Sequence, residues 1–310
     1  MKNNIFAERK EYNNVITVKI VVPSACNAEC HFCYNKDKNL ACDKYDFLSR
    51  FMTSLKDILD RISDKNPISV DITGGEPTLD VSLVKDILYQ LRENNIHDRV
   101  CRITMTTNGF HLKDIVNDLC GVVDYVNISV HDYRSLIRKQ IMGENALLYS
   151  DDYRSAVMAL MNRGIPCSCS SVVCNEIHNF SVWMDEFIKW AKKIGFIAIR
   201  FRYCCNQEIK NIPFDKYMLE TLARENEFQT ITHEQTPDSH WCRLRRKQDG
   251  FRLFFLHGVT DTSLVTKGIE YVIDNDGRCY CDYYKRTHID DYEYEIGKIY
   301  DLIFDGGQCL

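Results

Sequence analysis

Apolar and polar positions alternate with two different periods along the first two thirds of the chain. Short runs rich in β-branched residues predict strands at Val15–Val22, Ile68–Thr73, Val100–Thr106, Tyr125–Val130, Ile165–Val173 and Phe196–Phe201. Helical spacing of apolar residues predicts helices between them, at Asp46–Ile62, Ser82–Asn94, Leu112–Leu119, Tyr153–Asn162 and Val182–Lys193. Strands and helices that alternate in this way form βαβ units, so the sequence predicts an α/β protein with a parallel sheet.

The pattern changes after about Cys204. The segment Asn206–His240 is polar and is expected to be irregular, with one helix around Phe214–Glu225. Shorter apolar runs follow at Phe251–Leu256 and Ile269–Ile273. We therefore expect three parts, an N-terminal extension at 1–14, a main α/β domain at 15–203 and a smaller C-terminal region at 204–310 that packs on the sheet.

Composition narrows the class of protein. Of 310 residues, 45% are hydrophobic and 27% are charged, which is typical of a soluble globular chain and excludes a wholly disordered one. No apolar run approaches the ~20 residues that cross a bilayer, and the first residues, MKNNIFAERKEYNN, contain no apolar segment of a secretory signal. A net charge of −5 argues against DNA as a partner. We expect a cytoplasmic protein with no membrane partner.

Cysteine is unusually frequent, with 15 residues, and the odd number argues against a disulfide framework. In a reducing compartment, clustered cysteines bind metals or react, whereas scattered ones are small buried hydrophobic residues. Cys26, Cys30 and Cys33 are clustered with the spacing C-x3-C-x2-C directly after the first predicted strand. Three thiolates on one loop suit three irons of a 4Fe–4S cluster and leave the fourth iron open to a small chelating molecule. The alternative is a zinc site that borrows a distant fourth ligand.

A second motif stands at the end of the second predicted strand. The segment DITGGEPTL places Gly74 and Gly75 where the strand ends, and glycines there let the backbone approach a ligand closely. Glu76 adds a carboxylate that suits an ammonium group, and Pro77 stiffens the turn. By itself this is an ordinary βα turn, but one βα unit after the cysteine loop it indicates a cofactor site.

With both motifs, the chain resembles the radical S-adenosylmethionine (SAM) superfamily. The runs Thr106–Gly109 (TTNG) and Asn127–Val130 (NISV) match that family at the ends of the third and fourth strands. The resemblance implies a partial (β/α)6 barrel over residues 15–203 and cluster ligands at Cys26, Cys30 and Cys33. It also implies SAM contacts: Phe32 against the adenine, Gly74, Gly75 and Glu76 toward the methionine amino group, Ser129 near the ribose or carboxylate, and Thr107 and Asn108 lining the sites for SAM and substrate.

The same resemblance implies an enzyme and its chemistry. A reduced 4Fe–4S cluster would pass one electron into a C–S bond of SAM and yield methionine and a 5′-deoxyadenosyl radical, which abstracts hydrogen from the substrate. The protein would orient the substrate and exclude solvent. A flavodoxin or ferredoxin would serve as the reductant.

Within the superfamily the pattern is most similar to the GTP 3′,8-cyclase branch and to members with a twitch or SPASM extension that holds a second cluster. Lys19 stands where the cyclases have an arginine for GTP, and their second-cluster spacing is absent from the sequence. Cys242, Cys279 and Cys281 are the candidates for a second iron–sulfur cluster, and the alternative is that they are buried thiols.

Three functional hypotheses follow. The first is a radical SAM enzyme that acts on a peptide or a small metabolite. The second is a nucleotide-modifying relative of the cyclase or dehydratase kind. The third, of a different class, is a non-catalytic protein in which the cysteine loop holds zinc.

Overall fold

The fold is built on a run of parallel strands that follow one another in chain order. The computed structural model describes residues 16–33, 43–62, 67–175, 177–204, 212–235, 239–258 and 270–280. The strands are β1 (Ile16–Val22), β2 (Ile68–Gly74), β3 (Arg102–Thr107), β4 (Tyr125–Ser129), β5 (Cys167–Val173) and β6 (Ala198–Tyr203), each parallel to the next. All six agree with the predicted strands to within a few residues, which is the usual uncertainty at element ends.

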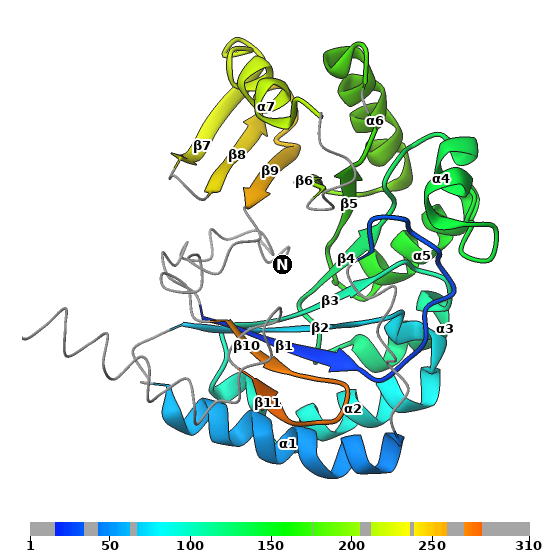
Figure 1. The fold of residues 1–310 in the computed structure, drawn as a ribbon, viewed down its shortest axis with the longest axis vertical. Helices are drawn as coiled ribbons and strands as arrows, with labels where there is room; N and C mark the ends of the chain where they lie inside the picture. The colour runs from blue at the N-terminus through cyan, green and yellow to red at the C-terminus, as the bar shows by residue number, and fades with distance from the viewer. Residues whose placement is uncertain are drawn as a thin grey trace, which may run out of the picture.

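Helices connect these strands and lie on the outer side of the curved sheet (Figure 1). They are α1 (Lys44–Arg61), α2 (Val81–Glu93), α3 (Leu112–Leu119), α4 (Ser135–Met142), α5 (Ser150–Asn162) and α6 (Phe180–Ile194), with 3-10 turns at Pro77–Leu79 and Ile96–Asp98. The Asp43 and Asp80 side chains cap α1 and α2 by accepting hydrogen bonds from backbone N–H groups of the first turns. The predicted α/β class is confirmed, and α4 is a helix that the sequence pattern did not reveal.

The strands of the C-terminal part extend the same sheet at both edges. The strand order is β11-β10-β1-β2-β3-β4-β5-β6-β9-β8-β7, so the described part of the chain forms an open sheet, a partial barrel that does not close. At one edge, β10 (Glu270–Ile273) runs parallel to β1 and pairs with β11 (Cys279–Tyr280). At the other edge, β9 (Arg252–Gly258) runs parallel to β6. The division at residue 203 stays a prediction.

The expectation of irregular structure over Asn206–His240 is wrong for much of its length. After α7 (Phe214–Leu222), the hairpin of β7 (Phe228–Gln235) and β8 (Ser239–Arg246) continues the sheet beyond β9. These strands contain many polar residues because β7 is an edge strand, and an edge strand gains from polar side chains that discourage further pairing.

The hydrophobic core fills the space between the sheet and the helices. On β6, Ile199 and Phe201 are fully buried, and Arg200 between them points to the opposite, concave face because side chains alternate along a strand. That concave face carries polar and charged residues such as Asp71, Thr104 and Arg200. No helix among the described residues is long and apolar enough to cross a membrane.

Candidate active site

The cysteine loop leaves the carboxyl end of β1 and is fastened to α4. The backbone N–H of Glu29 donates to the carbonyl of Met142 over 2.8 Å, and the N–H of Cys33 donates to the carbonyl of Cys30 over 2.9 Å. Cys26 and Cys33 are exposed, whereas Cys30 is half-buried. The loop therefore presents its outer thiols to solvent while its middle is held against the fold.

The three thiols lie near enough to influence one another. Burial raises the pKa of Cys30 to about 12, and the neighbouring Cys33 and Cys26 add to the increase because like charges disfavour a second thiolate. In the described ranges, no three Cys, His, Asp or Glu side chains converge closely enough to bind a metal ion. The donor set of three cysteines on one loop nevertheless has the chemistry of an iron–sulfur ligand set, because thiolates are the ligands that hold such clusters.

The glycines of the GGEP turn pack against the backbone that leads into this loop. A Cβ on Gly75 would lie 2.3 Å from the carbonyl oxygen of Ser24 and 2.7 Å from that of Ala25. At Gly74, with φ +151°, a Cβ would lie 2.6 Å from the carbonyl oxygen of Val22. The sequence suggested close approach to a ligand, and the structure gives a nearer reason: two backbone segments meet with no room for a side chain.

Hydrogen bonds join the same two segments. The N–H of Glu76 donates to the carbonyl of Ala25 over 2.9 Å, and the Ser24 hydroxyl donates to the carbonyl of Glu76 over 2.9 Å. The position of Cys26, one residue after Ala25, is therefore set by the turn that ends β2.

The Glu76 carboxylate is buried and accepts hydrogen bonds from the protein at both oxygens. Its Oε1 accepts from the Thr78 N–H (2.8 Å), the Thr78 hydroxyl (2.5 Å) and the Thr107 hydroxyl (2.5 Å), and its Oε2 accepts from the Asn108 N–H (2.5 Å). Burial raises the pKa of Glu76, and these hydrogen bonds oppose the increase by stabilising the charged form. The carboxylate therefore ties the end of β2 to the end of β3.

Asn108 continues this network to the cysteine loop. Its side-chain amide donates to the Asn27 side-chain oxygen over 2.7 Å, and Asn27 in turn donates to the carbonyl of Asn145 over 3.0 Å. Thr107 and Asn108 are both buried, so the structure brings them to Glu76 and to the loop. Asn27 and Ser24 were not singled out in the sequence, although both lie within three residues of Cys26.

Removal of the Thr107 hydroxyl provides a test of this network. In Thr107→Val, Glu76 loses one donor, and the Gly109 N–H loses the acceptor that it contacts over 2.9 Å. We expect the free energy of unfolding to fall by about 1–3 kcal/mol, because a buried N–H is left unpaired. Urea unfolding measures this loss. The exposed Thr53→Val is the control, with a change within about 0.5 kcal/mol. Equal stability of Thr107→Val and wild type would contradict the role of the network.

Phe32 and Ser129 lie at the same end of the sheet. The Phe32 ring contacts the His131 ring, with centroids 4.9 Å apart, and packs on a small apolar cluster. The buried members of that cluster are Ile141, Met142, Ala146, Cys174 and Cys204. Ser129 ends β4 and is half-buried.

His131 is a neutral neighbour of this region. Its φ of 65° is unusual for a residue other than glycine. Burial lowers the pKa of His131 to about 4, and Nδ1 accepts a hydrogen bond from the Val172 N–H over 3.2 Å. The imidazole therefore carries its proton on Nε2 at neutral pH.

The candidates for a second cluster lie far apart in the sheet order. Cys242 is fully buried on β8, opposite Phe255 of β9, and Cys279 is buried on β11 at the other edge. Burial raises the pKa of Cys242 to about 12, as expected of a thiol in an apolar core. Cys281 lies outside the described residues. The structure therefore does not bring Cys242 and Cys279 together.

Comparison with known protein families identifies this arrangement. The model of the radical SAM superfamily matches residues 20–197, which include the cysteine loop, the GGEP turn and the ends of β3 and β4. The chain belongs to the radical SAM superfamily. This radical SAM protein is therefore an enzyme rather than a non-catalytic zinc-binding protein, and its family implies a 4Fe–4S cluster and SAM as cofactors.

The curated relatives match only part of their length. A probable GTP 3′,8-cyclase of Sulfolobus acidocaldarius is 36% identical over 132 residues, which are 42% of this chain and 39% of the relative. One from Thermococcus kodakarensis is 28% identical over 188 residues, 59% of this chain and 55% of the relative. The matches thus span about two fifths to just over half of these cyclases.

Solved structures confirm the fold. SuiB of Streptococcus suis superposes with a TM-score of 0.58 at 15% identity, over 93% of this chain and 65% of SuiB. SuiB bound to its precursor peptide SuiA has a TM-score of 0.50 at 17% identity, over 69% of this chain and 47% of SuiB. At this level of identity, the likeness shows that the radical SAM protein shares a fold with SuiB.

Proposed function

We propose that this enzyme holds a 4Fe–4S cluster on Cys26, Cys30 and Cys33 and cleaves SAM to abstract hydrogen from a substrate at the carboxyl ends of the strands. The observation that carries the proposal is the continuous set of hydrogen bonds from the cysteine loop through Glu76 to Asn108. It fixes three separate motifs at one end of a parallel sheet, where active sites of such folds lie.

We propose separate roles in cofactor binding for the residues at this end of the sheet. When bound, the cluster supplies the electron that cleaves a C–S bond of SAM and yields methionine and a 5′-deoxyadenosyl radical. Phe32 and Ser129 are the proposed neighbours of the adenosyl part, and the turn at Gly74 and Gly75 is the proposed neighbour of the methionine part. Because both oxygens of the Glu76 carboxylate already accept hydrogen bonds from protein donors, we assign its side chain to positioning the turn.

A nucleotide is the substrate class that the concave face supports best. Burial raises the pKa of Asp71, and its neighbours Lys19, Arg202 and Arg200 oppose the increase, so these cations gather around one carboxyl. The Arg200 guanidinium lies over the rings of Tyr125 (5.3 Å) and Phe254 (5.5 Å), and its Nε is buried without a hydrogen-bond partner among the described residues.

Cations and aromatic rings on one face suit a phosphorylated, aromatic ligand. The similarity to probable GTP 3′,8-cyclases supports the same class. A peptide is the second candidate, and the shared fold with SuiB, which binds a precursor peptide, favours it. A small metabolite without a nucleotide part remains a third substrate class for the same chemistry.

Anaerobic reconstitution with iron and sulfide tests the proposed chemistry. With SAM and a strong reductant, the enzyme should release 5′-deoxyadenosine, measured by chromatography and mass spectrometry. A flavodoxin or ferredoxin is the proposed natural reductant. A chain that binds no iron under these conditions would contradict the proposal.

A substitution of Arg200 tests the substrate class. If a nucleotide binds the concave face, GTP or another nucleoside triphosphate should stimulate 5′-deoxyadenosine formation. Arg200→Gln should raise the concentration needed for half-maximal stimulation roughly tenfold or more, because a hydrogen bond to a charged group is lost. Arg163→Gln, whose guanidinium contacts the exposed Asn117 side chain, is the control and should behave as wild type. Stimulation that is identical in wild type and Arg200→Gln would contradict a role for Arg200 in binding.

A further inference from the structure

A pocket lies at the end of the sheet opposite to the proposed active site. It has a volume of about 520 Å³ and is formed where α6 ends, β6 and β9 begin and β8 ends. Ile197 precedes β6, and the cysteine loop belongs to the other end of the strands. Six residues of a strand cover roughly 20 Å, so the pocket is separate from the site proposed for SAM.

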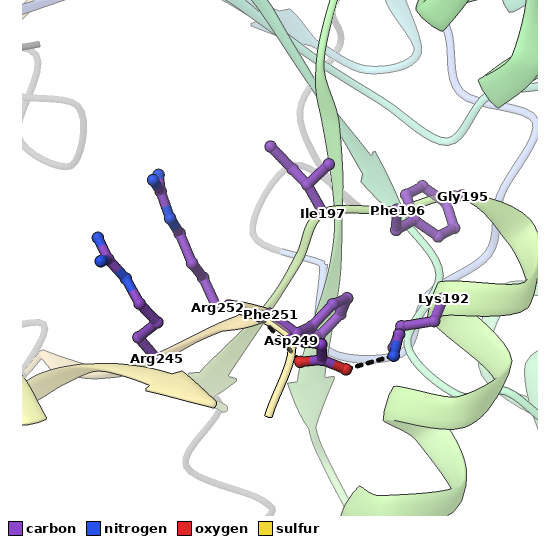
Figure 2. A pocket seen from close by; sticks show the side chains of 9 residues that line it. Lys192, Gly195, Phe196, Ile197, Arg245, Asp249, Phe251 and Arg252 are labelled. Carbon is purple, nitrogen blue, oxygen red and sulfur yellow. Dashed lines mark hydrogen bonds and ion pairs between the residues drawn. The ribbon is translucent and has the colours of Figure 1, made fainter. Parts of the chain in front are cut away.

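Two arginines stand side by side in this pocket. Arg245 of β8 and Arg252 of β9 are directly opposed in the antiparallel register. Figure 2 shows their side chains extending in the same direction, with the guanidinium groups next to each other. Like charges directly opposite each other on a sheet destabilise it, so this pairing needs a compensating partner.

The carboxylate that lines the same pocket, Asp249, is bound by other groups. Asp249 accepts from the Arg246 Nε over 3.0 Å, from the Phe251 N–H over 3.1 Å and from the Lys192 ammonium group (Figure 2). Arg246 first, then Lys192, holds the pKa of Asp249 well below its usual range. Neither Arg245 nor Arg252 forms an ion pair with any residue in the described part of the chain.

The remaining walls of the pocket strengthen its attraction for an anion. Phe196 and Phe251 are buried and present apolar surface beside the charged groups. Charges that border a poorly solvated wall interact more strongly than charges in open water. Lys192 adds a third cation at the rim, although Asp249 balances it.

We propose that Arg245 and Arg252 form a binding site for the phosphoryl group of a small molecule. Two guanidinium forks can each donate a pair of hydrogen bonds to a tetrahedral oxyanion, and together they match its double negative charge. A volume of about 520 Å³ is within the range of small-ligand pockets, so a nucleotide-sized molecule fits. This site neither contributes to nor depends on the cysteine loop.

Inorganic pyrophosphate is the first probe, applied to the reconstituted full chain in phosphate-free buffer. Isothermal titration calorimetry should detect binding to the wild type, and thermal unfolding should shift upward as pyrophosphate is added. Arg245→Gln and Arg252→Gln should each weaken pyrophosphate binding roughly tenfold or more. Arg154→Gln, on the exposed face of α5, is the matched control and should bind as the wild type does.

Stability without ligand shows whether the variants are folded. Each single variant should unfold at the same temperature as the wild type or above it, because one of two opposed charges is gone.

GTP and succinate then distinguish the source of the anion. Tighter binding of GTP than of pyrophosphate identifies a nucleotide and supports the site, provided that Arg245→Gln weakens it.

Three results would overturn the proposal. The first is that the wild type does not bind pyrophosphate and that Arg245→Gln does not weaken the binding of GTP. The second is that pyrophosphate binds equally well to the wild type and both glutamine variants. The third is that succinate binds more tightly than pyrophosphate, which would assign the pocket to carboxylates. None of these results depends on SAM cleavage, so the proposed function and this site fail independently.

Discussion

Cys30→Ala should reduce the iron content of the reconstituted protein from about four atoms per chain to none and abolish formation of 5′-deoxyadenosine. Cys30 is the middle thiol of the loop and is half-buried between α4 and the ends of β5 and β6. With only Cys26 and Cys33 left, two thiolates remain for a cluster that needs at least three. Iron and sulfide analysis, together with chromatography of the SAM products, measures both effects.

The control for this variant is another single cysteine. Cys120 is exposed just after α3, and Cys120→Ala should retain full iron content and full SAM cleavage. Circular dichroism should show the same helix content in both variants, because neither substitution creates a large cavity. Full iron and wild-type SAM cleavage in Cys30→Ala would show that the proposed ligand set is wrong.

Gly75→Val should also lower the iron content, although the residue carries no metal-binding atom. Its Cβ would lie 2.3 Å from the Ser24 carbonyl oxygen, so the turn and the segment from Ser24 to Cys26 have to separate. The hydrogen bond from the Glu76 N–H to the Ala25 carbonyl is then lost. We expect the iron content to fall by more than half and the stability to fall by about 1–3 kcal/mol.

Gly121→Val is the control that separates this steric clash from the backbone strain caused by placing a side chain on a glycine with positive φ. Gly121 has a φ of +76°, and a Cβ there meets nothing within 4 Å, so its substitution strains only the local backbone. The control should lose stability and keep its iron. If Gly75→Val keeps normal iron but loses SAM binding, the glycines act on the cofactor directly. If it keeps both, the contact between the turn and the loop is unimportant.

The distribution of charge over the sheet is a feature that the net charge of the sequence does not describe. A net charge of −5 argues mildly against an anionic substrate. The sheet register nevertheless places Arg200 and Arg243 on either side of Phe254, on one face of neighbouring strands. Charge near a binding site depends on which strands become neighbours, and net charge contains no information about that.

The elements were predictable where the pattern is local. The strands β1 to β6 alternate with helices whose apolar residues recur every three or four positions. Such residues form one apolar face that is buried against the sheet, and this face makes each helix recognisable in the sequence. The pattern is weaker for α4, which has only eight residues, one of them the buried Arg138. The Arg138 guanidinium is stabilised there because it donates hydrogen bonds to the carbonyls of Asp132, Tyr133 and Leu148. No sequence period reveals a buried arginine whose partners lie in flanking loops.

Local sequence patterns were enough to predict the cysteine loop, the GGEP turn, the six parallel strands and the family, because each depends on residues close together in the chain. Three contacts could not be predicted in this way: Asn27 with Asn108, Gly75 with the Ser24 backbone, and Arg245 opposite Arg252. Those contacts arise when distant strands and loops pack together. Their partners are chosen by sheet register and by the space between backbones, which no local pattern contains.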